Sequence, residues 1–144
     1  MLIQLIYLSQ PFGFDTPTLN GILVDARRNN RQDEISGALI CRSDIYLQLL
    51  EGPCSAIEAA YRRIAADDRH LEIHRLLTTE VTQRLFPNWD MFDDPARSWL
   101  WSPREVAAGD VLQASRAELV GVFERVSREA ARAANHPADR QYVG

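Results

Sequence analysis

The spacing of apolar and polar residues along the first 93 positions predicts strands and helices in the order βαββαββ. Residues 2–9 are apolar and β-branched on both faces, which is typical of a central strand. Residues 35–52 show two short apolar runs joined by a polar turn, as in a hairpin. The other predicted elements are helices over about 16–30 and 55–67, a long strand over 71–81 and a short strand over 89–92.

Local signals mark where the two predicted helices begin. Thr16 is a good N-cap and Pro17 suits the first helical position. Ser55 and Glu58 have the spacing of a capping box, which predicts the start of the second helix there. Helix 16–30 carries one apolar face, and the second helix carries another.

Two βα crossovers around antiparallel strands give an α+β, ferredoxin-like fold, with both helices on one face of the sheet. The other face then needs a cover. A capping box from Ser102 to Glu105 predicts a short helix over about 103–108, and Gly109 can end it. Apolar residues at helical spacing predict a longer helix over about 111–134, which we expect on the open face or at a subunit contact.

Composition narrows the class of protein. A chain of 144 residues with 46% hydrophobic residues can bury one full core. The net charge of −4 disfavours direct binding of nucleic acid. The apolar runs are too short for a membrane span, and the first residues lack the features of a signal peptide, so we expect a cytoplasmic protein. Cys41 and Cys54 have no zinc-site spacing, and Cys41 fits a core strand.

Gln48 is the polar residue that packing alone explains least well. It lies between Leu47 and Leu49 in a predicted apolar strand, where a buried amide needs hydrogen-bond partners. In the predicted fold, Tyr7 and Gln48 lie on the sheet beneath two neighbouring helices, and a flat aromatic ligand fits between those helices. Other polar residues also occupy positions where apolar ones would be expected: Asn29, Asn30, Arg63, Asp67 and His70.

Most of these residues also have an explanation that needs no ligand. Tyr7 is compatible with a core tyrosine whose hydroxyl reaches the rim. Asn29 and Asn30 are compatible with a helix C-cap. Arg63 and Asp67 are four residues apart and have the spacing of a surface ion pair.

Residues that commonly perform enzymatic chemistry are not arranged for it. His70, His74 and His136 lack metal-ligand spacing, and no catalytic triad, carboxylate pair or Gly-rich phosphate loop is evident. His70 is compatible with a partner of the helix dipole, and Trp89 and Met91 with strand packing. The sequence therefore predicts no metal site and favours binding over turnover.

A set of motifs, in order along the chain, matches a known family: Tyr7, Arg28–Asn30, Ile35–Gly37, Leu47–Gly52, Arg63–Ile64, Asp67–His70 and Arg84–Met91. The chain resembles the BLUF family of blue-light sensors using FAD over residues 1–93, leaving 94–144 as a C-terminal helical extension. Two departures are small: Ser36 replaces the usual threonine, and Ser43–Ile45 replaces a turn that usually contains glycine.

The resemblance implies a flavin site: FAD, with FMN or riboflavin possible in the same pocket. By similarity, Ile22 and Ile64 hold the two faces of the flavin ring. Asn30 bonds its pyrimidine edge, with Asn29 beside it, and Gln48 lies at the ring. The positions that match those facing the ring edge, ribityl chain or phosphates are Arg63, Asp67, Arg69 and His70.

The resemblance also implies a light-driven mechanism. The excited flavin takes an electron from Tyr7, a proton follows through Gln48, and the pair recombines with Gln48 rotated or tautomerised. The last strand, with Trp89 and Met91, relays the change, and which of the two faces the flavin stays open. A separate downstream protein receives the signal, and a homo-oligomer, most simply a dimer, is expected.

Two other functions stay open at the level of sequence. One is an acylphosphatase-type enzyme on the same ferredoxin-like fold, although residues 9–13 lack the arginine that its phosphate loop requires. The other is a ligand-free interaction module that works through its C-terminal helices. Colour separates both from a flavin sensor, since only the sensor is yellow.

Overall fold

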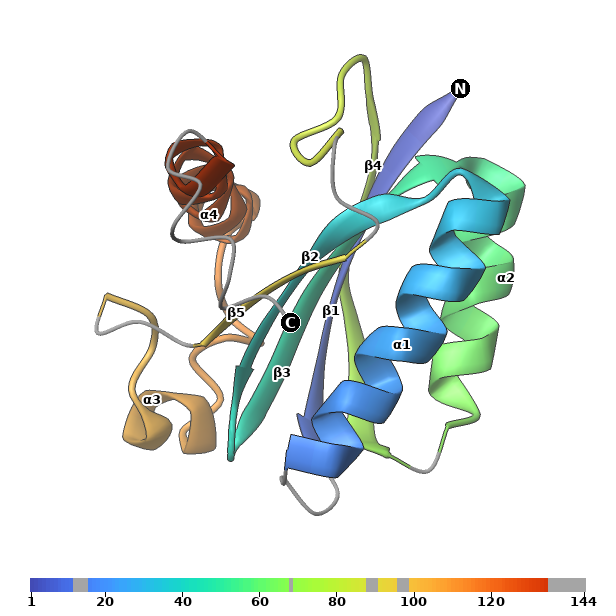
Figure 1. The fold of residues 1–144 in the computed structure, drawn as a ribbon. Coiled ribbons are helices and arrows are strands. Elements are labelled where there is room, and N and C mark those ends of the chain that lie inside the picture. Colours follow the sequence, from blue (N-terminus) through green and yellow to red (C-terminus); the bar gives the residue numbers. More distant parts are fainter. Residues whose placement is uncertain (12–15, 68, 88–90, 96–98, 135–144) are drawn as a thin grey trace.

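The computed structural model describes residues 1–11, 16–67, 69–87, 91–95 and 99–134. It has the predicted βαββαββ order followed by two helices (Figure 1). The five strands form one sheet in the order β4-β1-β3-β2-β5. The elements are β1 (Leu2–Pro11), α1 (Thr16–Asp33), β2 (Ser36–Arg42), β3 (Ile45–Pro53), α2 (Cys54–Ala65), β4 (His70–Val81), β5 (Phe92–Pro95), α3 (Pro103–Ala107) and α4 (Arg116–Ala134).

Pairing of the strands confirms the ferredoxin-like arrangement. β1 is an inner strand and is antiparallel to both β3 and β4, while β2 pairs antiparallel with β3 and parallel with β5. Tyr7 of β1 is the register partner of Gln48 of β3. Because partners in a ladder point to the same face, both side chains lie on one side of the sheet.

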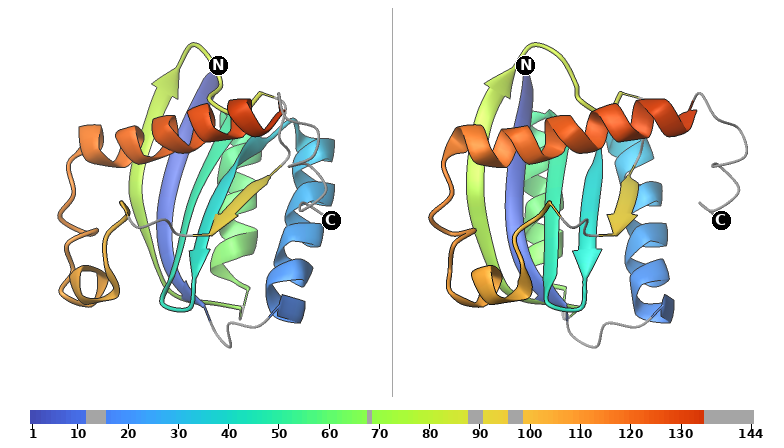
Figure 2. Two further views of the ribbon diagram at one scale, coloured as in Figure 1. Left: turned by 60° about the vertical axis from the view of Figure 1, so that its left-hand side comes forward. Right: turned by 90° about the vertical axis from the view of Figure 1, so that its left-hand side faces the viewer.

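Two cores lie on opposite faces of the sheet. Helices α1 and α2 cover the face that carries Leu5, Tyr7 and Leu50. Helix α4 crosses the strands on the other face, where its Phe123 and Val126 are fully buried (Figure 2). The expectation that C-terminal helices cover the open face is therefore confirmed.

Gly37 allows β2 to approach β3 closely. A Cβ atom at this position would lie 2.0 Å from the Leu49 carbonyl oxygen, a distance that no side chain can accept. The glycine of the Ile35–Gly37 motif thus serves the hairpin that presents Gln48.

Helix α1 is longer than predicted. It continues to Asp33 and ends where Glu34 adopts a left-handed conformation, with φ of 60°. Asn29 and Asn30 do not cap it, because they lie inside the helix, and Asn30 is also buried. The C-cap explanation for Asn29 and Asn30 is therefore wrong.

The predicted starts of two other helices need correction. Helix α2 starts at Cys54 with Pro53 as its N-cap, and the Ser55–Glu58 capping box does not form. Helix α4 starts at Arg116 rather than near 111, because Ser115 and Glu118 exchange the two hydrogen bonds of a capping box, at 3.0 and 3.1 Å.

The last strand is also displaced along the chain. β5 covers Phe92–Pro95, whereas the sequence predicted 89–92, of which 89 and 90 lie outside the described residues. Phe92 is the first residue to pair with β2, opposite Ala38. Met91 comes just before the ladder, and its carbonyl bonds to Arg27 instead.

The short helix α3 follows its prediction. Ser102 and Glu105 form the capping box, and Gly109, with φ of 85°, stands just after the helix end. Cys41 is buried in the core as predicted. Within the described ranges, none of the helices is both long enough and apolar enough to cross a membrane.

Candidate functional site

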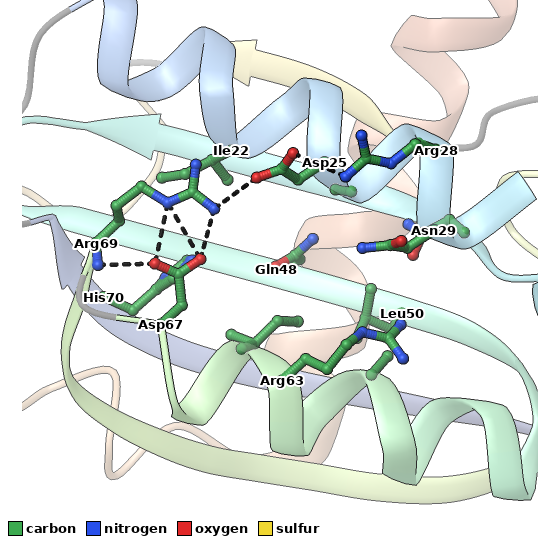
Figure 3. Close-up of a pocket in the computed structure, with 14 residues that line it drawn as sticks. Ile22, Asp25, Arg28, Asn29, Gln48, Leu50, Arg63, Asp67, Arg69 and His70 are labelled. Carbon is green, nitrogen blue, oxygen red and sulfur yellow. Dashed lines mark hydrogen bonds and ion pairs between the residues drawn. The ribbon is translucent and has the colours of Figure 1, made fainter.

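A cavity of about 200 Å³ opens between α1 and α2 above β3 (Figure 3). All nine residues that the resemblance implied for the cofactor line it. They come from α1, β3, α2, the turn that leads into β4 and the start of β4: Ile22, Asn29, Asn30, Gln48, Arg63, Ile64, Asp67, Arg69 and His70.

Five further lining residues were not assigned to the cofactor from the sequence: Asp25, Ala26, Arg28, Leu50 and Ala60. Helical spacing could have indicated Asp25 and Ala26, which stand three and four residues after Ile22 on the same face of α1. Likewise, Leu50 stands two residues after Gln48 and so shares its face of β3. Ala60 is a buried apolar residue of α2, the second of the two helices for which the sequence predicted an apolar face.

Tyr7, Gln48 and Met91 form a buried hydrogen-bonded chain at the floor of the site. The Tyr7 hydroxyl donates to Gln48 Oε1, and Gln48 Nε2 donates to Met91 Sδ at 3.2 Å. Both ends of the amide are thus engaged. All three residues are at most 3% exposed. Burial raises the pKa of the Tyr7 phenol well above its ordinary value, and the charge of Asp67 adds to this effect.

An ion cluster lies at the mouth of the cavity. Arg69 bonds Asp67 at 2.6 Å and Asp25 at 2.9 Å, so it links the turn before β4 to α1 (Figure 3). The hydrogen bond from Arg69 lowers the pKa of Asp67, and the same bond raises the pKa of Arg69. This cluster places one cation and two anions beside the entrance.

Arg63 does not form the predicted surface pair with Asp67. Its Nη2 lies 3.2 Å from Asp33 at the end of α1, while Asp67 bonds to Arg69. The reason is the turn after α2, which folds Arg69 back onto Asp67. Arg63 therefore joins the two helices that flank the cavity.

His70 is a buried residue of β4 and does not act at a helix end. Its Nδ1 lies 2.8 Å from Ser9 Oγ. Its ring packs edge-on against Tyr7 and Tyr46, with centroids 5.9 and 5.2 Å apart. Burial lowers the pKa of His70 to about 4, although the negative charge of Asp67 acts in the opposite direction.

This low pKa predicts a stability change with pH. The unfolded histidine, with pKa near 6.5, takes up its proton before the folded one as the pH falls, so stability is lost between about pH 6.5 and 4. Asp67 titrates below this window because its pKa is lowered. We expect His70→Gln to remove about 2 kcal/mol of the difference in unfolding free energy between about pH 7 and 5.

Urea denaturation at the two pH values measures this effect. His74→Gln is the matched control, since His74 is an exposed histidine of the same strand and should leave the difference unchanged. An unaltered pH dependence in His70→Gln would show that the buried imidazole is not its source.

Of the two predicted relay residues, the structure places Met91 against Gln48. Trp89 lies outside the described residues. No group of three His, Cys, Asp or Glu side chains that could hold a metal ion occurs in the described part of the chain. The site is therefore a cavity with apolar walls, amide groups at its floor and charges at its mouth.

Comparison with known proteins connects this site to a family. The family described as "Sensors of blue-light using FAD" (BLUF) matches residues 2–92. The blue light- and temperature-regulated antirepressor BluF of Escherichia coli K12 is 34% identical over 97 residues, covering 65% of this chain and 24% of BluF. The photoactivated adenylate cyclase subunit beta of Euglena gracilis is 32% identical over 88 residues, covering 60% of this chain and 10% of that protein.

A solved structure has the same fold. The BLUF protein BlrB in its dark state superimposes with a TM-score of 0.74 at 24% identity, covering 89% of this chain and 96% of BlrB. The chain spans only about a tenth to a quarter of the two curated relatives.

Proposed function

Because the chain belongs to the BLUF family of blue-light sensors using FAD, we propose that Tyr7 and Gln48 are its photoactive pair and that it signals to a separate protein. The observation that carries this proposal is the buried chain from the Tyr7 hydroxyl through the Gln48 amide to the Met91 thioether. The Gln48 end of this chain lines the cavity. Membership of this family favours a flavin sensor over the two alternatives, an acylphosphatase-type enzyme and a ligand-free interaction module.

The cavity residues fit a flavin. Ile22 of α1 and Ile64 of α2 line the cavity from its two flanking helices and offer apolar walls to a flat ring. Asn29, Asn30 and Gln48 offer amide donors and acceptors, which match the mixed polar edge of such a ring.

Charged residues at the mouth suit the rest of the cofactor. Arg28 and Arg63 are exposed arginines that line the cavity, and arginine pairs well with phosphate oxygens. Asp67 and Arg69 complete this rim, and the buried His70 also lines the cavity. We assign them to the ribityl and phosphate portion of FAD, with FMN and riboflavin as smaller ligands for the same pocket.

The residues of the chain set the mechanism. A bound flavin supplies absorption of blue light and acceptance of an electron. Tyr7 is the donor: it gives up one electron, and its hydroxyl proton moves toward Gln48. Both return to Tyr7, so nothing is consumed and no turnover is expected. Gln48 ends rotated or tautomerised, because exchanging its donor and acceptor ends hardly changes its volume.

Output follows from where Gln48 ends. Met91 loses or changes its bond to Gln48 Nε2, and the segment leading to β5 carries that change to the edge of the sheet. One redirected hydrogen bond contributes about 1 kcal/mol, which can shift a balanced equilibrium.

We assign residues 1–93 to the sensor and 94–144 to a helical extension that meets a partner. We further expect the protein to be cytoplasmic and to form a homo-oligomer, most simply a dimer.

The first test is colour. Protein purified in the dark should be yellow, and blue light should shift its absorption slightly to the red, with recovery in darkness. A difference spectrum taken before and after illumination measures this shift. Colourless protein that cannot be loaded with any flavin would contradict the proposal.

A further inference from the structure

Arg27 connects α1 to Met91, which precedes β5, and to Asp93 of β5. Its Nε and Nη2 donate to the Met91 carbonyl at 3.2 and 3.1 Å. Nη2 also donates to Asp93 Oδ1 at 2.8 Å. Its neighbours Ala26 and Arg28 line the cavity, but Arg27 itself is not among the lining residues. Its role is therefore separate from contact with a ligand.

Met91 is held at both ends. Its thioether accepts from Gln48 at 3.2 Å, and its carbonyl accepts twice from Arg27. The Met91 residue is 1% exposed, whereas the Arg27 and Asp93 side chains are each 31% exposed. The surface pair thus secures a buried contact through the backbone of a single residue.

We propose that Arg27 is a positioning residue that holds the Met91 thioether against Gln48, with Asp93 orienting the guanidinium. This inference deepens the proposed function, since Gln48 is the switch on which it acts. A guanidinium suits the task because its planar fork directs two donors at one carbonyl and one of them also at a carboxylate. Lysine, with a single point charge, cannot reproduce this geometry.

The bonds from Arg27 to Met91 and Asp93 form a clamp, which limits how Met91 can move. Met91 cannot withdraw from Gln48 by a backbone shift without stretching its bonds to Arg27. Those bonds are charge-assisted and so are stronger than neutral ones. Helix α1, which forms one wall of the cavity, is thereby coupled to the strand proposed to carry the output.

Methionine labelling isolates the decisive contact. The chain has two methionines, Met1 and Met91, so a sample labelled with ¹³C at the methionine methyl gives two signals. Met1 is 82% exposed and Met91 is 1% exposed. In dark protein, a soluble gadolinium chelate should broaden the Met1 signal and spare the Met91 signal.

Arg27→Gln should shift the Met91 methyl resonance and make it sensitive to the chelate. The population with Met91 withdrawn should rise about tenfold or more, the factor expected from losing a hydrogen bond to a charged group. Arg31→Gln is the matched control, because Arg31 is an exposed arginine one turn further along α1. It should leave the Met91 signal as in the unaltered chain.

Asp93→Asn provides a second variant, because it weakens the orientation of Arg27 and leaves α1 unchanged. It should move the Met91 signal in the same direction by less. If Arg27→Gln does not fold, Asp93→Asn decides alone. An unchanged Met91 signal in the folded variants would overturn the proposal.

The outcome is independent of the photocycle. The methyl signals are recorded in darkness and require no red shift, so a protein without a photocycle could still show the clamp. Conversely, a normal red shift with an unaltered Met91 signal in Arg27→Gln would overturn the clamp and leave the proposed function standing.

Discussion

Replacing Gln48 with leucine is expected to abolish the reversible red shift while flavin stays bound. The cavity keeps its apolar walls and its other amides, so binding should weaken little. The switch is lost, because leucine can neither accept from the Tyr7 hydroxyl nor donate to Met91 Sδ. The measurement is the light-minus-dark spectrum of the loaded variant.

Gln4→Leu is the matched control for this prediction. Gln4 is another buried glutamine in a central strand, but its amide donates to Glu51 at 3.1 Å on the opposite face of the sheet. Its replacement should cost stability and leave the red shift intact. A Gln48→Leu protein that still photocycles normally would refute the role assigned to Gln48, as would loss of the shift in Gln4→Leu.

The sequence alone was sufficient to single out Gln48, because the free-energy cost of burying an amide without a partner can be recognised from the neighbouring residues. A polar amide between two leucines of a β-strand needs a partner wherever the strand lies. The identity of that partner depends on the register, in which Tyr7 faces Gln48 across β1 and β3. Tyr7 and Gln48 are 41 residues apart in the sequence, and tertiary packing sets the register that pairs them. Only the family resemblance indicated that these two residues act together.

The contacts that sequence reasoning missed are those made at a distance by residues with an ordinary local explanation. Arg27 and Asp25 stand on a helix where charged residues are common, and their partners Asp93 and Arg69 are far along the chain. The Ser55–Glu58 signal was misleading for a related reason. Pro53 is already the N-cap of α2, two residues before Ser55. Glu58 bonds Arg75 of β4 at 2.8 Å instead.

Glu51 was part of a motif, yet its structural role became visible only in the fold. It is fully buried, and its carboxylate accepts four hydrogen bonds. The backbone amides of Leu85 and Phe86 donate at 2.9 and 2.6 Å, and Ser36 Oγ and Gln4 Nε2 donate at 3.2 and 3.1 Å. It thereby fastens the segment after β4 to the sheet. Ser127 of α4 also bonds this segment, through the Leu85 carbonyl at 2.7 Å.

Glu51→Leu should therefore lower the free energy of unfolding by about 3 to 5 kcal/mol. The substitution leaves two buried side-chain donors and two backbone amides without their acceptor. Glu51→Gln should cost less, since its amide oxygen still accepts. Urea denaturation in the dark measures both. Glu58→Gln, which removes a surface ion pair with Arg75, is the control and should cost less than about 1 kcal/mol. Equal losses in Glu51→Leu and Glu58→Gln would contradict the view that Glu51 anchors the segment leading to Met91.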